Sequence, residues 1–124
     1  MIDVSDEQFN DLITQAMDEL PQERLAGLQN VAIVFEDNPS EEQHTKLKLR
    51  GDQTLLGLYE GIPLTKRGIG YNFVLPDKIT LFKNALSHRA SNPVELKEEI
   101  KHTLWHEIAH YYGLDHDQIQ KLDT

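Results

Sequence analysis

Four of the chain's six histidines lie in one stretch, HTLWHEIAHYYGLDH (residues 102–116). Within it, His106 and His110 are four residues apart, and residues at this spacing share one face of a helix. Two imidazoles one turn apart can bind the same metal ion. Glu107 directly follows the first histidine, where a carboxylate can take a proton from a metal-activated water. The pattern predicts a zinc site with Glu107 as the general base.

A zinc ion that performs hydrolysis usually has three protein ligands and leaves its fourth position to water. We expect His116 to be the third ligand, because Gly113 tolerates a left-handed conformation and lets the chain turn back after the helix. The full spacing, His-Glu-x-x-His-x-x-Gly-x-x-His, is that of the metzincin peptidases, although no methionine follows for their methionine turn. Asp115 and Asp117 flank His116 and are the alternative third ligands.

The other chemistry-bearing residues near this motif have simpler interpretations. We expect the three remaining histidines to lie at the surface: His44, His88 and His102. The aromatic residues of the motif are expected in the core or in a cleft wall: Trp105, Tyr111 and Tyr112.

Composition narrows the class of protein. The 124 residues are enough for a single domain, residues 1–124, and the absence of cysteine leaves only His, Asp and Glu as metal ligands. The 12 basic and 21 acidic residues give a net charge of −9, which opposes a nucleic-acid partner. The acidic start, MIDVSDEQFN, is unlike a signal or transit peptide, and no apolar run is long enough to span a membrane. We therefore expect a cytoplasmic protein with no membrane partner.

Two helices have clear boundary signals. Ser5, followed three residues later by Gln8, predicts a capping box, and Pro21 ends the first helix. The last helix is predicted to start at Asn92 as N-cap, with Pro93 in the first turn, and to end at Gly113. Its apolar residues recur at four-residue spacing: Leu96, Ile100, Leu104 and Ile108. The histidine motif thus lies on the second half of this helix.

Between these helices the pattern predicts strands and loops. Residues 31–36 (VAIVFE) predict a buried strand, residues 36–46 an exposed and mobile loop, and residues 76–82 (PDKITLF) a second strand. We interpret 76–82 as an edge strand that could pair with an extended peptide. Residues 53–68 predict an irregular segment or a short strand followed by a loop. Three polar residues in or near this segment could line a cleft or stabilise an oxyanion, although the first could equally belong to the core: Tyr59, Arg67 and Tyr71.

Three stretches resemble the small bacterial zincin-like metallopeptidase family: LLGLYEGIPLTKRG (55–68), LPDKITLF (75–82) and HTLWHEIAHYYGLDHDQI (102–119). The resemblance covers most of the chain. It implies a compact α+β fold, in which a short mixed sheet packs on an N-terminal helix and a C-terminal zinc-binding helix. It also implies a zinc peptidase site with His106 and His110 as ligands and Glu107 as the base. The family usually carries Asp at the third-ligand position, where this chain has His116.

Two other classes remain open beside a zinc-dependent, monomeric peptidase that acts on peptides or proteins. The motif resembles part of the His-Gly-x-x-His-x-x-Gly-x-Asp-His pattern of endoribonucleases of ribosomal RNA maturation, but Glu107 stands where those enzymes carry glycine. The second class is a metal-binding module without turnover. Glu107 argues against it, because a structural metal site has no need of a base.

Overall fold

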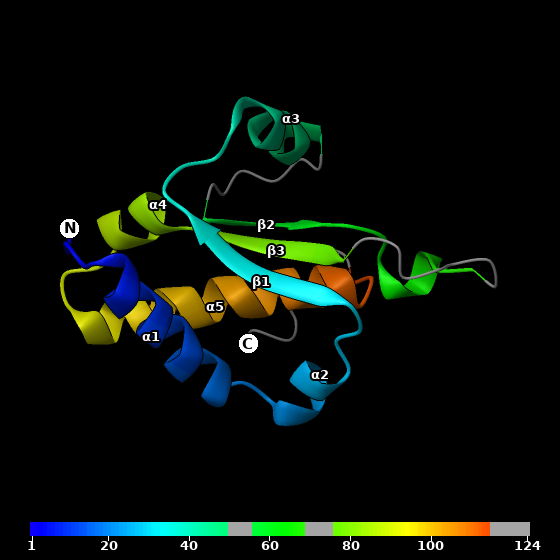
Figure 1. Cartoon of the computed structure of the whole chain (residues 1–124), viewed down its shortest axis with the longest axis horizontal. Coiled ribbons are helices and arrows are strands. Elements are labelled where there is room, and N and C mark those ends of the chain that lie inside the picture. Colours follow the sequence, from blue (N-terminus) through cyan, green and yellow to red (C-terminus); the bar gives the residue numbers. More distant parts are fainter. Residues whose placement is uncertain (50–55, 69–75, 115–124) are drawn as a thin grey trace.

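The computed structural model describes residues 1–49, 56–68 and 76–114 of the chain (Figure 1). In these ranges the fold is α+β, as predicted, with a three-stranded sheet packed against helices. The elements are, in chain order, α1 (Asp6–Asp18), α2 (Gln22–Ala26), β1 (Val31–Glu36), α3 (Glu41–Leu49), β2 (Gly57–Glu60), the 3-10 helix η1 (Leu64–Lys66), β3 (Asp77–Phe82), α4 (Lys83–His88) and α5 (Pro93–Tyr111). No helix in these ranges is both long and apolar enough to cross a membrane.

The sheet has the strand order β1-β3-β2, with β3 parallel to β1 and antiparallel to β2. The prediction that residues 76–82 form an edge strand is therefore wrong, because β3 is the central strand. Its residues are almost all buried, as expected for a strand covered on both faces. The strand predicted to be buried, β1, lies instead at the sheet edge and is partly exposed, with Val34 at 37%.

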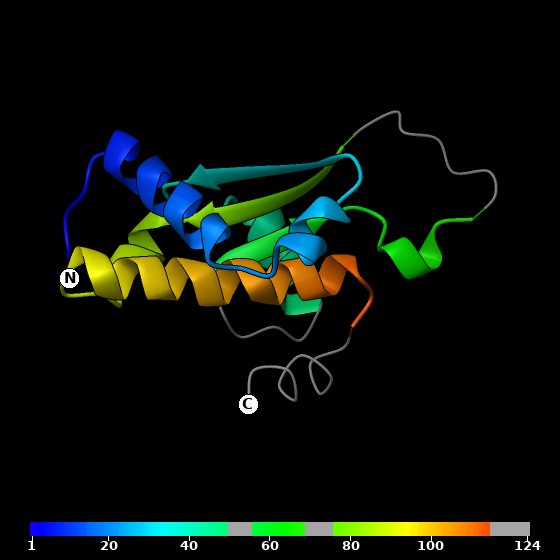
Figure 2. The ribbon, with the colours of Figure 1, turned by 90° about the horizontal axis from the view of Figure 1, so that it is seen from below.

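One face of the sheet carries the larger part of the core. The register aligns Ile33, Ile79 and Tyr59 in one row across the three strands. This row packs on Leu104 and Ile108 of α5, which runs along the sheet with α1 at its side (Figure 2). The sheet therefore serves as the support against which the second half of α5 is held.

The boundary signals of α1 and α5 act as the sequence predicts. Ser5 and Gln8 form a reciprocal capping box, and the Asn92 side chain accepts a hydrogen bond from the Glu95 backbone N–H at 2.9 Å. The four apolar residues at four-residue spacing on α5 are all fully buried: Leu96, Ile100, Leu104 and Ile108. This stripe fixes which face of α5 turns toward the sheet.

The end of α5 is a Schellman turn. The Leu114 N–H donates to the Ala109 carbonyl at 3.1 Å, and the Gly113 N–H donates to the His110 carbonyl at 2.9 Å. Gly113 has a φ of +84°, so its predicted role as the glycine that ends the helix is confirmed.

The prediction of a mobile loop over residues 36–46 is wrong, because helix α3 begins within this range. Ser40 and Gln43 form a second capping box: the Ser40 N–H donates to Gln43 Oε1 at 2.8 Å, and the Gln43 N–H donates to Ser40 Oγ at 3.1 Å. α3 lies beyond β2, at the side of the sheet opposite β1 (Figure 1). The short helices α2 and α4 were not predicted either, because neither has a side-chain cap.

Candidate metal centre

His106 and His110 converge from consecutive turns of α5, as the four-residue spacing requires. Their Nε2 atoms are 3.3 Å apart, the ring centroids are 4.9 Å apart, and both residues are half-buried. Two nitrogens that each lie about 2.0–2.1 Å from one tetrahedral zinc ion are about 3.3–3.4 Å apart. The pair therefore fits the separation that a shared zinc ion would require.

Glu107 completes a group of three ligand-type residues on α5. Its carboxylate and the two imidazoles offer atoms that all lie within 4.8 Å of one another. In contrast to the half-buried histidines, Glu107 is fully buried. Among the residues that the structure describes, this is the group of His and carboxylate side chains that could hold a metal ion.

A backbone group of β2 orients the Glu107 carboxylate. Glu107 Oε1 accepts a hydrogen bond from the Tyr59 N–H at 2.8 Å. In an antiparallel pair, the backbone N–H and C=O groups of successive residues point to alternate sides of the strand. The Phe82 N–H of β3 donates to the Leu56 carbonyl, so the backbone groups of Leu56 and Leu58 point toward β3. The Tyr59 N–H therefore points the other way, to the outer edge of the sheet. Glu107 meets the strand at that outer edge.

Gly57 allows α5 to come this close to β2. A Cβ atom at position 57 would lie 2.7 Å from Thr103 Cγ2 and 3.5 Å from Glu107 Cγ. Any side chain here would separate the strand from the helix at the level of Glu107. The sequence alone did not identify Gly57 as part of the site, although it begins the Gly-Leu-Tyr stretch of the family resemblance.

The predicted third ligand, His116, lies outside the described residues, as do its alternatives Asp115 and Asp117. The structure does describe the turn that leads to them. Thr65 of η1 packs directly on Gly113, so closely that a Cβ atom there would overlap its side chain. The end of α5 is therefore held by both the Schellman turn and η1.

The side chains of Tyr59 and Arg67 are largely buried and meet at one carboxylate, so for Tyr59 the core alternative holds. Tyr59 is 7% exposed and belongs to the core, and its hydroxyl donates to Asp77 Oδ2 at 2.5 Å. Arg67 forms an ion pair with the same oxygen. Burial, and then the hydrogen bond to Asp77, raise the pKa of Tyr59 well above its usual range. The third candidate of this set, Tyr71, lies outside the described residues.

Residue types alone do not predict that Asp77 joins Tyr59 and Arg67 in this buried group. A carboxylate at the start of an otherwise apolar strand is a signal that it must be paired, because an isolated buried charge is costly. Arg67, in the other segment of the resemblance, was its available partner.

The remaining predictions for this region are confirmed. His44, His88 and His102 are all exposed. Tyr111 is fully buried, and Trp105 and Tyr112 are half-buried and pack against the same part of the core.

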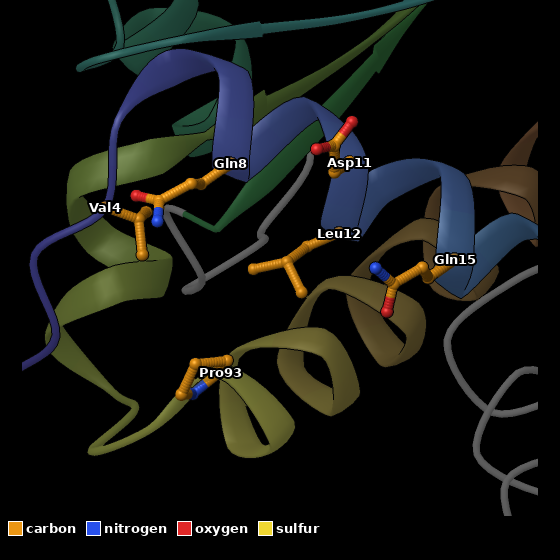
Figure 3. Close-up of a pocket in the computed structure, with 6 residues that line it drawn as sticks. All are labelled: Val4, Gln8, Asp11, Leu12, Gln15 and Pro93. Atoms are coloured by element: carbon orange, nitrogen blue, oxygen red, sulfur yellow. The ribbon is translucent and has the colours of Figure 1, made fainter.

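The described surface has two further hollows. Figure 3 shows a pocket of about 200 Å³ between α1 and the first turn of α5, lined by Val4, Gln8, Asp11, Leu12, Gln15 and Pro93. Pro93 precedes His106 by thirteen residues, which is about 20 Å along a helix. A depression of about 830 Å³ is lined by His44 of α3, by three residues of α4 and by residues outside these helices: Met1, Asn38, Pro39, His44, Leu56, Asn84, Ala85, His88 and Arg89.

The fold presents a His-Glu-x-x-His helix with three residues that could hold a metal ion. The chain matches the zincin-like metallopeptidase family over residues 28–124, and it belongs to that family. The resemblance noted in the sequence is thereby confirmed. Membership implies a divalent metal ion, typically zinc, and His106, Glu107 and His110 are the described residues able to hold it.

The fold also resembles that of a solved structure. A conserved hypothetical protein from Thermus thermophilus superposes with a TM-score of 0.55 at 22% identity, over 88% of this chain and 94% of the other. At this level of identity the likeness concerns the fold alone. A comparison with curated proteins finds no match.

Proposed function

We propose that this chain is a zinc-dependent metallopeptidase that hydrolyses peptide bonds. One observation carries the proposal: His106 and His110 bring their Nε2 atoms to 3.3 Å beside the buried carboxylate of Glu107. Two ligands on consecutive turns of one helix, with a base directly after the first ligand, form an arrangement that suits metal-assisted hydrolysis. The family assignment supports the same class of reaction.

Each residue has a distinct part in this proposal. His106 and His110 hold the metal, with His116 as the third ligand and Asp115 and Asp117 as its competitors. Zinc, when bound, supplies a Lewis acid that polarises the scissile carbonyl and makes water more acidic. Glu107 accepts the proton of the attacking water and returns it to the leaving amine. The Tyr59 N–H donates to Glu107 Oε1 and so holds the carboxylate in one orientation.

The substrate in this proposal is an extended peptide or a protein segment, taken up by a monomer in the cytoplasm. The strand next to Glu107 at the sheet edge is β2, since β3 is central. Any pairing between the sheet and a peptide near the base would therefore involve β2. Backbone pairing needs no charge, so it is compatible with the net charge of −9.

The net charge and Glu107 both disfavour the endoribonuclease alternative. A protein of net charge −9 can neutralise few phosphates and should hold RNA weakly at physiological salt. Glu107 also occupies the position at which those nucleases carry glycine, and it is built into the site through Tyr59. A metal-binding module without turnover would keep the zinc but have no use for this base.

The test compares the zinc-loaded protein with Glu107→Gln and Glu98→Gln. Each is incubated separately with a diverse peptide library and with structured RNA, with and without a chelator. The amide of Glu107→Gln is nearly isosteric and can still accept the Tyr59 N–H, but it cannot take a proton. Glu98 lies on the same helix with a side chain 54% exposed, so Glu98→Gln is the matched control.

We expect peptide cleavage that the chelator and Glu107→Gln abolish and that Glu98→Gln retains. Metal-dependent RNA cleavage without peptide cleavage would replace the proposal with the nuclease class. Turnover of neither substrate, with zinc bound in full, would count against a general peptidase and favour the binding module.

A further inference from the structure

Two of the segments that carry the family resemblance contribute buried polar side chains that the proposed reaction does not use. Tyr59 and Arg67 come from residues 55–68, and Asp77 comes from residues 75–82. Asp77 Oδ2 accepts hydrogen bonds from the Tyr59 hydroxyl and from an Arg67 terminal nitrogen, each at 2.5 Å. The three side chains form one network that joins β2, β3 and the segment after η1.

This network is an unusual feature for the interior of a small domain. The side chains of Arg67 and Asp77 are only 6% and 5% exposed. Burial of an ion pair costs desolvation, and such pairs add little to stability unless further hydrogen bonds satisfy them. Arg67 has these: its Nε donates to the Ile62 carbonyl at 2.9 Å, and its guanidinium lies 5.1 Å from the centre of the Tyr111 ring. The arrangement favours one defined geometry more than it favours added stability.

A glycine makes room for this geometry. Gly61 has a φ of +154°, and a Cβ atom at this position would overlap the Asp77 carboxylate. The Ile62 N–H that follows approaches Asp77 Oδ1 at 3.4 Å. The chain after β2 therefore wraps tightly around the Asp77 side chain, and the Gly-x-Pro stretch of the resemblance has a structural reason.

Tyr59 connects the network to the base. Its hydroxyl is held by Asp77, while its backbone N–H donates to Glu107 Oε1. At the other end, Arg67 contacts Tyr111, which follows Glu107 by four residues on α5 and so lies one turn away on the same face. The Tyr59 and Tyr111 rings also meet edge to face, with centroids 6.2 Å apart. The network thus fixes β2 and α5 relative to each other at the level of Glu107.

We propose that Tyr59, Asp77 and Arg67 are positioning residues, which hold the backbone of β2 so that the Tyr59 N–H orients the Glu107 carboxylate. The inference rests on the proposed function for the meaning of Glu107, but the hydrogen bond that it concerns can be measured without turnover.

The experiment measures amide hydrogen exchange by NMR in the full chain and in two variants, Tyr59→Phe and Arg67→Lys. Tyr59→Phe removes one oxygen atom and is the variant most compatible with folding. Tyr112→Phe is the matched control, because it removes a tyrosine hydroxyl that also bonds at 2.5 Å, to the Arg24 carbonyl outside the network. The Leu58 amide, which faces β3, serves as an internal reference for the strand.

We expect the amide of residue 59 to exchange about tenfold faster relative to that of Leu58 in both network variants, and the ratio to stay constant in Tyr112→Phe. Equal acceleration at both amides would mean that the network contributes only to overall stability, and an unchanged ratio would show that it does not hold the Tyr59 N–H. Either result would overturn the proposal. Absence of peptidase activity would leave this readout intact, so the two proposals can fail separately. If the protein is active, the variants should lose kcat with little change in KM.

Discussion

Gly57 on β2 and Thr103 on α5 are in direct contact, so that a Cβ atom at position 57 would lie 2.7 Å from Thr103 Cγ2. The carbonyl of Thr80 lies 3.3 Å from the same point, so the crowding comes from backbone as well as from a side chain. The helix that carries the histidines therefore approaches the sheet edge as closely as a glycine permits. Glu107 lies one turn after Thr103, and this contact sets its distance from β2.

Gly57→Ala should therefore destabilise the fold, because the added methyl group has no space between strand and helix. We expect a loss of about 1–3 kcal/mol in the free energy of unfolding, measured by urea denaturation. Gly68 is the control, since a Cβ atom there would meet nothing within 4 Å. Gly68→Ala should change stability by less than about 0.5 kcal/mol. A Gly57→Ala variant as stable as the parent would mean that strand and helix separate easily.

Zinc affinity should depend on two of the three histidines on α5. Loss of a hydrogen-bond partner outside the ligand shell typically weakens metal affinity 10–100-fold, so His106→Ala and His110→Ala should weaken it at least about a hundredfold. His102→Ala, one turn earlier and exposed, should bind zinc like the parent chain. Competition with a chromophoric chelator measures all three. Normal zinc binding by His106→Ala would contradict the predicted site.

Zinc should also stabilise the folded chain, because the convergent imidazoles exist only in the native state. At a free zinc concentration 100 times Kd, the gain should be about 2.7 kcal/mol. A rise in Tm on adding zinc, reversed by a chelator, is the expected result. The same titration of His106→Ala should give a gain of at most about 0.4 kcal/mol. A rise of equal size in that variant would indicate zinc binding elsewhere on this acidic chain.

The elements that position the motif could be predicted because each has a local signal. Ser5 and Gln8 mark the start of α1, Asn92 that of α5, and Gly113 its end. Ser40 and Gln43 form the same capping-box signal at the start of α3. No apolar stripe follows it, and the polar sequence therefore favours a loop. A capping box satisfies backbone hydrogen bonds at the start of a helix, and it does so even where the helix that follows has little apolar surface to bury.

The strand order and the buried network could not be obtained in the same way. The central place of β3 depends on which strands pair, and pairing is a long-range choice that alternation along one strand does not encode. The phenol of Tyr59 is compatible with an open cleft when only its residue type is considered. It lies in the core because its hydroxyl bonds to Asp77, which is eighteen residues away in the sequence. The ligand pair, by contrast, depends only on helical spacing, and its convergence could be predicted in full.

The stability of the protein should fall in alkaline solution partly because of Tyr59. Burial and the Asp77 carboxylate raise its folded pKa above the unfolded value of about 10. A group with a raised folded pKa gives its full stabilisation below the unfolded pKa and loses it as pH rises toward the folded pKa. One such group lowers the free energy of unfolding by about 1.4 kcal/mol per pH unit above pH 10.

Tyr59→Phe should make the fall of the unfolding free energy with pH shallower, by up to the contribution of one proton. Urea titrations between about pH 9 and pH 11 measure this slope. Tyr112→Phe should also make the slope shallower, because burial raises the pKa of Tyr112 too, but by less than Tyr59→Phe, since no carboxylate adds to the shift of Tyr112. An identical slope in the parent chain and in Tyr59→Phe would mean that Tyr59 does not control the alkaline transition.

The third zinc ligand is predicted to be His116, reached through the turn at Gly113 and Thr65. His116→Ala should lose most of the bound zinc in elemental analysis after dialysis, whereas Asp115→Ala and Asp117→Ala should retain it. The physical reason is spacing: His116 follows His110 by six residues across a glycine turn, as in other three-histidine zinc sites. His116→Asp is the informative conservative change, because Asp is the residue that the family usually carries there and can itself bind zinc. It should restore a large part of the metal that His116→Ala loses. Full zinc in His116→Ala together with its loss in Asp117→Ala would reassign the ligand to Asp117, and loss only in Asp115→Ala would reassign it to Asp115.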